Sequence, residues 1–585
     1  MQVEIRNFSI ILLVFTDFQF LISKLKISSL HHSNKTHKLK HMKADTKKPN
    51  ILILITDQQR SIQHFPEGWA EKYLPWTTYL KDNGVTFENN MCSSTACSPS
   101  RSTIFSSTYP IINGVLKVND TIQMSRTLPM GGSLVTLGKI MTEAGYNMVY
   151  KGKWHLDGSF ASNSYIRPQN QDRMLIEDDA MENHYDFPGW TSPDLGTTEA
   201  FDISSTESVE PSDNCTLNSI GGGTVDNDNR IVNGPMFSET QECAVDFIKN
   251  YDSNSEKPFC LVVSLANPHD IWVYPYTQDT AGYTDPIWTT EIYDDFQVPP
   301  SYEHGLDNKP KAQQDFLNGF QNGPLDSEDA LNYVKFYAYL QTIIDDLTGD
   351  IIKALQENSL EEDTFIVRLS DHGEMSMAQG GLRQKENNIY KETISVPMIY
   401  TNPSLKQGEV RDDLVSLIDL MPTLAEIAGA EIDDHYSIQG ESYAQTVLEG
   451  KSNEREYNYF ATDDCGASSY TCIRGLIGHD YKYAVYYAAS YGNPDYGIVN
   501  FNGEIITENE LCGKTISIPI EYELYDYSTD GGRMETENLL HDIGNLDANT
   551  QDIWEKLHSI LTDKMKETFT IPENWSLTTP EAQTD

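Results

Sequence analysis

The chain has 585 residues, of which 39% are hydrophobic, and a formal net charge of −45 at neutral pH. This length exceeds what one hydrophobic core usually organises, so we expect more than one domain. The acidity argues against a nucleic-acid partner, because an acidic surface repels phosphates. No run of about 20 apolar residues occurs, so we expect no integral membrane association.

The first 48 residues differ in charge from the rest of the chain, with nine Lys or Arg against three Asp or Glu. An interrupted apolar run at residues 8–22 resembles the hydrophobic region of a signal peptide, but no small-residue cleavage site follows it. Two interpretations stay open. The protein is secreted, periplasmic or routed through the endoplasmic reticulum if this run is a signal, and cytoplasmic if translation starts at Met42.

The first buried strand of the folded part ends in polar side chains. Residues 51–55, which follow Asn50, are continuously apolar, which favours a strand buried on both faces of a parallel sheet. Asp57 and Gln58 follow this strand, where open α/β sheets collect ligand-binding groups. Their hard oxygen atoms suit Ca²⁺ or Mg²⁺. The alternative is that Asp57 caps a helix.

A second motif, Cys97-Ser98-Pro99-Ser100-Arg101, brings a thiol and an arginine to the start of an expected helix. Pro99 suits the first turn, where its missing N–H would have no partner anyway. Cys97 then lies at the positive end of the helix dipole, which stabilises negative charge. Arg101 offers a planar fork of donors toward the same point. The alternative is a buried structural cysteine.

Three more expected strands, at residues 147–150, 259–265 and 364–369, are also followed by charged or ionisable side chains. These are Lys151, Lys153 and His155, then His269, and finally Asp371 and His372. The carboxyl ends of parallel strands meet at one sheet edge, so these groups should lie near Asp57. Lysine and histidine side chains there suit an oxyanion site. The alternatives are a solvated basic turn at residues 151–155 and a structural role for His269.

These motifs, in this order, resemble those of the type I sulfatases of the alkaline phosphatase superfamily, including arylsulfatases and choline-sulfatase-like members. The resemblance covers roughly residues 49–545. It implies that a maturation enzyme oxidises Cys97 to formylglycine (3-oxoalanine). It also implies one divalent cation, which we expect to be Ca²⁺, with Mg²⁺ or Mn²⁺ as alternatives.

The resemblance also assigns roles to individual residues. The implied metal ligands are Asp57, Gln58, Cys97, Asp371 and His372, and the implied catalytic residues are Cys97, Arg101, Lys153, His155, His269 and Lys385. In this scheme a hydroxyl of the hydrated aldehyde attacks sulfur. The sulfuryl charge is neutralised by Arg101, Lys153 and Lys385. His269 assists the departing alcohol, and His155 helps the second hydroxyl to expel sulfate.

Two positions leave alternatives open. Lys391 competes with Lys385 as the sulfate-binding lysine. Many family members carry Asp where this chain has Gln58, and the glutamine resembles choline-sulfatase-like and phosphonate-hydrolase-like members. A phosphonate monoester or phosphodiester hydrolase is therefore the alternative to a sulfatase, and an inactive anion-binding relative is a third candidate.

We predict an α/β fold with a large, mixed, mostly parallel sheet sandwiched by helices, as in alkaline phosphatase. From residue 457 the chain has short, Tyr-rich, alternating stretches, which are typical of a small antiparallel sheet, and a terminal helix follows at residues 553–569. The expected division is a basic tail or poor signal at 1–48, a catalytic domain at 49–445 and a C-terminal subdomain at 446–585. The expected partners are a sulfated small molecule or glycan and the maturation enzyme.

Overall fold

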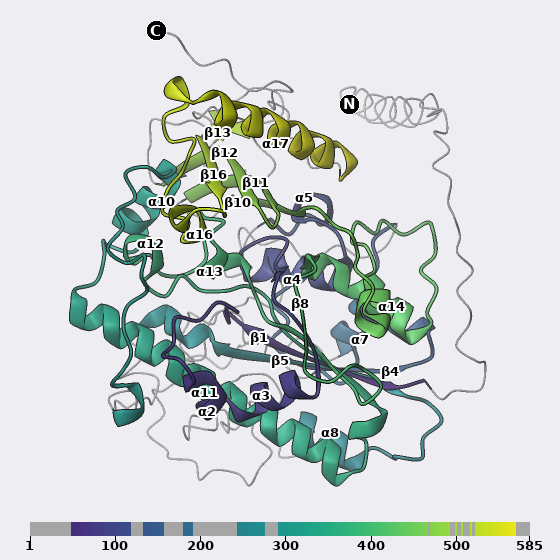
Figure 1. Cartoon of the computed structure of the whole chain (residues 1–585). Coiled ribbons are helices and arrows are strands. Elements are labelled where there is room, and N and C mark those ends of the chain that lie inside the picture. The colour runs from purple at the N-terminus through teal and green to yellow at the C-terminus, as the bar shows by residue number, and fades with distance from the viewer. Residues whose placement is uncertain are drawn as a thin grey trace, which may run out of the picture. The chain divides into compact units, whose positions relative to one another are not determined.

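Figure 1 shows the computed structural model of the chain. The structure describes residues 48–116, 118, 133–156, 179–190, 243–274, 290–465, 469–491, 498–499, 505–506, 515–516 and 521–568. The chain divides into two units, residues 1–47 and 48–585, and all described residues belong to the second. Residues 1–47 of the expected tail lie outside the described residues. The domain division at residue 445 stays a prediction.

The large sheet has seven strands in the order β4-β5-β1-β6-β7-β2-β8. Four neighbouring strands, β4 to β6 in this order, are parallel, whereas β7 is antiparallel to both β6 and β2. The predicted mixed, mostly parallel sheet is therefore confirmed. The strands are β1 (Asn50–Asp57), β2 (Gly84–Phe87), β4 (Asn147–Gly152), β5 (Phe259–Pro268), β6 (Thr364–Ser370), β7 (Met398–Thr401) and β8 (Glu409–Arg411).

Helices cover both faces of this sheet. Alternate residues of a strand point to opposite sides, and in β1 both sets of side chains are apolar, so both faces must be buried. Ile51, Ile53 and Ile55 of β1 pack in one core with helices α4 (Cys97–Ser106), α6 (Leu137–Glu143) and α14 (Leu420–Ala428). Leu52 and Leu54 pack on the other face with α3 (Pro75–Asp82), α8 (Ala244–Asn250) and α11 (Ser327–Glu357). Figure 1 shows the two helical layers on either side of the strands.

The remaining short elements connect these layers. The short helices are α2 (Trp69–Tyr73), α5 (Pro110–Asn113), α7 (Asp179–Tyr185), α10 (Lys311–Asp315), α12 (Ala378–Gly381), α13 (Lys391–Ile394), α15 (Ala444–Glu449) and α16 (Asp530–Arg533). Strands β3 (Asn90–Met91) and β9 (Val415–Ser416) form a two-stranded pair. None of the described helices is long and apolar enough to cross a membrane.

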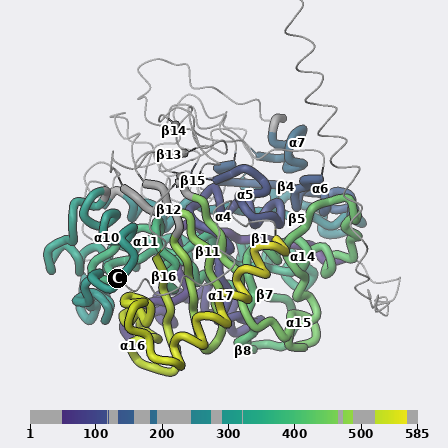
Figure 2. Tube along the Cα trace, turned by 90° about the horizontal axis from the view of Figure 1, so that it is seen from above, coloured from purple at the N-terminus to yellow at the C-terminus, as the bar shows by residue number. Residues whose placement is uncertain are grey.

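The C-terminal part forms the predicted antiparallel sheet and terminal helix. Strands β10 (Asn458–Cys465), β11 (Ser469–Ile477), β12 (Tyr481–Tyr491) and β16 (Glu521–Asp526) pair in this order. Helix α17 (Ala548–Glu567) packs across them through Trp554, Leu557 and Leu561 (Figure 2). Three short strands, β13 (Ile498–Val499), β14 (Ile505–Ile506) and β15 (Thr515–Ile516), form a further small sheet.

The C-terminal sheet touches both segments that carry expected site residues. The backbone N–H of Ala461 in β10 donates to the carbonyl of Ser93 (3.0 Å), and Thr462 Oγ1 donates to the carbonyl of Thr95 (2.7 Å), directly before α4. Lys482 Nζ in β12 donates to the carbonyl of Ile389 (2.6 Å), four residues after Lys385. The small sheet therefore supports the segment that leads into α4 and the Lys385 segment.

Candidate active site

The strand ends of the large sheet meet because β4, β5, β1 and β6 run in the same direction side by side. The paired residues near these ends are Gly152 with Ser264, Asp57 with Pro268, and Thr56 with Ser370. The groups that follow each strand therefore lie at one edge of the sheet, as the sequence predicts. Asp57, Lys153, His269 and Asp371 are all buried there.

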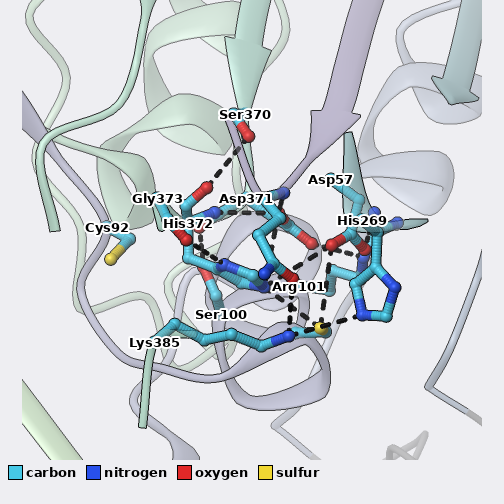
Figure 3. Close-up of polar contacts among 12 residues, drawn as sticks. Asp57, Cys92, Ser100, Arg101, His269, Ser370, Asp371, His372, Gly373 and Lys385 are labelled. Atoms are coloured by element: carbon cyan, nitrogen blue, oxygen red, sulfur yellow. Dashed lines mark hydrogen bonds and ion pairs between the residues drawn. The ribbon is translucent and has the colours of Figure 1, made fainter. Parts of the chain in front are cut away.

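Four potential metal ligands form one cluster at this edge (Figure 3). One ligand atom each from Asp57, Cys97, Asp371 and His372 lie within 4.8 Å of one another, and all four residues are buried. Cys97 Sγ is 3.0 Å from His372 Nε2. His372 Nδ1 lies 3.0 Å from the carbonyl oxygen of Gly373, which only accepts, so Nδ1 donates to it and in a neutral ring Nε2 would carry the lone pair that a metal needs.

The donor set fits a hard cation at every position except the thiol. Two carboxylates and an imidazole suit a divalent cation, whereas a soft sulfur atom does not suit Ca²⁺ or Mg²⁺. The Cys97 thiol stands where formylglycine would carry oxygen in place of sulfur. The site therefore fits both the metal and the modified residue that the sequence motifs imply.

Arg101 joins the two carboxylates of the cluster. Its Nε donates to Asp371 Oδ2 (2.9 Å), its Nη2 to Asp57 Oδ2 (3.2 Å), and its Nη1 to the Lys153 carbonyl and to Ser264 Oγ (both 2.8 Å). Burial alone would lower the pKa of Arg101, but Asp371 and Asp57 raise it above its usual value. Arg101 therefore joins both carboxylates with two of its four hydrogen bonds and fixes the guanidinium group with the other two.

Asp57 is ionised although it is fully buried. Burial would raise its pKa, but the positive charge of Lys153, which contributes most, and that of Arg101 hold the pKa well below the usual range. Lys153 Nζ lies 2.7 Å from Asp57 Oδ2. In turn burial would lower the pKa of Lys153, but Asp57 raises it, so this lysine stays charged.

Lys385 and His269 lie together beside the cluster. Lys385 Nζ donates to Gln58 Oε1 (2.7 Å) and lies 3.3 Å from His269 Nε2. Burial, followed by the charges of Lys153 and Lys385, lowers the pKa of His269 well below its usual value. His269 is therefore neutral, and its Nε2 accepts a hydrogen bond from Lys385, because an ammonium group only donates.

The structure separates the two competing lysines. Lys391 begins helix α13, and its Nζ donates to the carbonyl of Arg533, away from the cluster. Among the expected site residues, His155 is also buried and lies two positions after Lys153, with a left-handed backbone (φ 60°).

Two serines at the site were not among the expected residues. Ser100 Oγ donates to the carbonyl of Asp371 (2.5 Å), and Ser264 Oγ accepts from Arg101. A sequence signal existed for Ser264, since it is a polar residue within the otherwise apolar run Phe259–Leu265. Ser100 lies inside the Cys97 motif, but nothing in the sequence shows that its hydroxyl reaches the strand that ends at residue 370.

Comparisons with known proteins agree with this site. Residues 49–430 match the family model "Sulfatase", and residues 384–496 match the model "N-sulphoglucosamine sulphohydrolase, C-terminal". The chain thus belongs to the sulfatase family. It is a sulfuric ester hydrolase, which cleaves a sulfate ester to an alcohol and inorganic sulfate.

Individual relatives share a low sequence identity with this chain, but the matches cover most of both chains. The chain is 25% identical over 532 residues to the uncharacterised sulfatase YidJ of Escherichia coli, covering 89% of this chain and 87% of that one. It is 25% identical over 399 residues to the choline-sulfatase of Rhizobium meliloti, covering 66% and 69%.

Solved structures show the same fold. A protein in complex with its substrate D-glucosamine-2-N,6-O-disulfate matches with a TM-score of 0.59 and 19% identity, covering 91% of this chain and all of that one. A phosphonate monoester hydrolase from Silicibacter pomeroyi matches with a TM-score of 0.56 and 18% identity, covering 92% of this chain and all of that one.

Removal of Arg101 should destabilise the metal-free protein. Arg101→Leu leaves two buried carboxylates without their shared partner, and breaking such a pair costs about 3 kcal/mol or more of unfolding free energy. Urea unfolding in the presence of EDTA measures this loss. Arg533→Leu removes an arginine that is 54% exposed and should change the unfolding free energy by less than about 0.5 kcal/mol. Equal stabilities of Arg101→Leu and the wild type would contradict the bridging role.

Proposed function

We propose that this sulfatase works with Ca²⁺ and with a formylglycine made from Cys97, and that the expected site residues act as its ligands and catalytic groups. One observation carries the proposal. The Cys97 side chain lies at the start of α4, buried within a cluster of two carboxylates and an imidazole. A developing negative charge at this position meets both the helix dipole and a divalent cation.

The burial of the cluster supports Ca²⁺ over Mg²⁺. Asp57, Gln58, Asp371 and His372 are all fully buried, so that protein groups must supply most of the ligands. Mg²⁺ usually keeps several water molecules, whereas Ca²⁺ accepts a flexible set of protein oxygen atoms. When bound, the cation supplies charge stabilisation to oxygen atoms at position 97 and on the substrate.

The aldehyde hydrate of formylglycine supplies a hydroxyl nucleophile, which a thiol does not. The residues around position 97 supply positive charge and fix the carboxylates. Lys153 and Lys385 bring positive charge to the site, since both are buried and charged and can neutralise the sulfuryl oxygens. Arg101 holds the ligand carboxylates apart at a fixed spacing.

His269 is placed to help the leaving alcohol. Because its Nε2 accepts from Lys385, its proton must reside on Nδ1. Within the part of the chain that the structure describes, this Nδ1 is buried without a hydrogen-bond partner. Its N–H is therefore available to donate to the departing oxygen atom. As Nδ1 gives up its proton, the Lys385 ammonium group can pass one to Nε2, so that the ring stays neutral.

Conversion of Cys97 is tested by mass. We expect the tryptic peptide that carries Cys97, from protein made in its native source, to be lighter by about 18 Da, the thiol-to-aldehyde change. Cys97→Ala should abolish turnover of sulfate esters while the protein still folds. An unmodified peptide in fully active protein, or full turnover by Cys97→Ala, would refute the proposed nucleophile.

Lys385 and Lys391 form a matched pair of variants. Lys385→Met should lower kcat/KM for a sulfate ester by about 10²- to 10³-fold, because it removes a buried donor to the reacting oxygens. Lys391→Met should stay within about threefold of the wild type, because its ammonium group donates to the Arg533 carbonyl. Steady-state kinetics measure both, and the reverse order of effects would show that Lys391 is the sulfate-binding lysine.

We infer that the substrate is a sulfated small molecule or glycan. The match of residues 384–496 to an N-sulphoglucosamine sulphohydrolase model, and the sugar disulfate bound by a structural neighbour, support a sulfated sugar. A phosphonate monoester or phosphodiester hydrolase is the second candidate, favoured by Gln58 and by the fold shared with the Silicibacter pomeroyi enzyme.

Rates on a substrate panel separate these candidates. We expect D-glucosamine 6-sulfate or an aryl sulfate to be hydrolysed at least tenfold faster, by kcat/KM, than a phenyl phosphonate ester. A sulfate monoester presents three terminal oxygen atoms to the buried donors, whereas a phosphonate ester replaces one of them with carbon and leaves a donor unpaired. Faster phosphonate hydrolysis would favour the second candidate.

A further inference from the structure

The side chain of Gln58 has different partners for its oxygen and its nitrogen. Its Oε1 accepts a hydrogen bond from Lys385 Nζ (2.7 Å), and its Nε2 donates to Glu374 Oε2 and to Gln384 Oε1 (3.0 Å). The two ends of an amide have nearly the same shape, so only their partners decide which end faces a neighbouring cation. A metal requires the oxygen end, because the NH₂ group carries no available lone pair.

Glu374 is built to accept hydrogen bonds. It is fully buried and follows the ligand pair Asp371 and His372 at the end of β6. Its Oε1 accepts from the hydroxyl of Tyr333 (2.9 Å) and from the backbone N–H groups of Ser376 (3.0 Å) and Gln384 (2.7 Å). Its Oε2 accepts from Gln58. A carboxylate only accepts, so it forces the NH₂ group of Gln58 toward itself.

Helix α11 contacts the segment that contains Gln58 and Gln59. Tyr333, Tyr337 and Gln341 are spaced four residues apart, which places them on one face of the helix. Tyr337 donates to the carbonyl of Gln58 (2.7 Å), and Gln341 Oε1 accepts from Gln59 Nε2 (3.1 Å). Gln58 itself has a left-handed backbone (φ 69°), which side-chain-bearing residues rarely adopt. Its backbone and its side chain are therefore both fixed.

Glu374 also supplies charge that the ligand lacks. An aspartate in the place of Gln58 would bring its own negative charge to the cation, whereas an amide brings none. The carboxylate of Glu374 lies one hydrogen bond behind this amide. It polarises the amide so that more negative charge collects on the oxygen end, as partners behind a metal ligand commonly do.

We propose that Glu374 is a positioning residue of the metal site, which turns the Gln58 oxygen toward the cation and provides the negative charge behind it. This inference rests on the proposed function, since it takes Gln58 as a ligand of Ca²⁺. Glu374 does not touch the substrate or the reacting atoms in this scheme; it acts through Gln58.

Calcium affinity of the full-length protein tests the proposal. The metal is removed with EDTA, the chelator is dialysed away, and Ca²⁺ is titrated into the protein by isothermal calorimetry. Glu374→Gln should bind Ca²⁺ about 10- to 100-fold more weakly than the wild type, because a glutamine at 374 can present an N–H to Gln58 and turn its amide around. Glu523→Gln is the matched control, since Glu523 is also fully buried and accepts from Tyr486 and Tyr525 in the C-terminal sheet. It should stay within about twofold.

The decisive comparison places Glu374→Gln in a second background. In Gln58→Glu, Glu374 faces another carboxylate and repels it, so Glu374→Gln should now raise the Ca²⁺ affinity by donating to the new carboxylate at position 58. A merely structural role for Glu374 would lower the affinity in both backgrounds. If the single variant Glu374→Gln does not fold, the Ca²⁺ affinities of Gln58→Glu and of the double variant still test the role of Glu374.

The outcomes separate this inference from the proposed function. Two results would overturn the role of Glu374 and leave the proposed function standing. One is a Ca²⁺ affinity of Glu374→Gln within threefold of the wild type, and the other is a lower Ca²⁺ affinity in both backgrounds. Failure of the wild-type chain to bind Ca²⁺, together with full turnover in EDTA, would overturn the metal dependence and this inference with it. A loss of affinity in the wild-type background and a gain in the Gln58→Glu background supports the proposal.

Discussion

The ion pairs between Arg101 and two buried carboxylates are the constraint on which the site depends. Asp57 and Asp371 come from strands more than 300 residues apart in sequence and end at the same sheet edge. Two neighbouring negative charges in a buried environment repel each other and lose their hydration. Arg101 offsets both effects with a rigid fork that reaches one oxygen of each carboxylate. The catalytic helix, two strands and the proposed metal ligands are thereby joined through one side chain.

Neighbouring residues determine how the proposed metal ligands are oriented. Gly373 sets the tautomer of His372, and Glu374 sets the orientation of the Gln58 amide. Lys385 contacts both Gln58 and His269. Burial, followed by the charges of Lys153 and Lys385, keeps the His269 ring neutral. In the proposed scheme, the groups that contact the cation or the substrate are oriented by neighbours that touch neither.

The sequence predicted the elements and the sheet edge well, because their signal is local. The apolar run at residues 51–55 and the largely apolar stretches at 259–265 and 364–369 indicate buried strands, and the polar residues directly after them indicate the site. The partners of Arg101 and the contact of Glu374 with Gln58 could not be predicted, because they join residues that are far apart in sequence. Periodicity likewise does not report that Tyr333, Tyr337 and Gln341 turn their shared face toward Gln58. The residue roles stay predictions.

The contact of β10 with Ser93 and Thr95 has a consequence for the order of events during synthesis. Cys97 is only 1% exposed in the folded chain, so the proposed oxidation of this residue requires that an enzyme reach it before α4 is enclosed. Strand β10, which seals the segment before α4, begins at Asn458, about 360 residues later. At about 5–20 residues per second, a ribosome needs roughly 20–70 s to make this stretch. If Cys97 is converted as proposed, this distance along the chain leaves the cysteine accessible to a modifying enzyme for that time while translation continues.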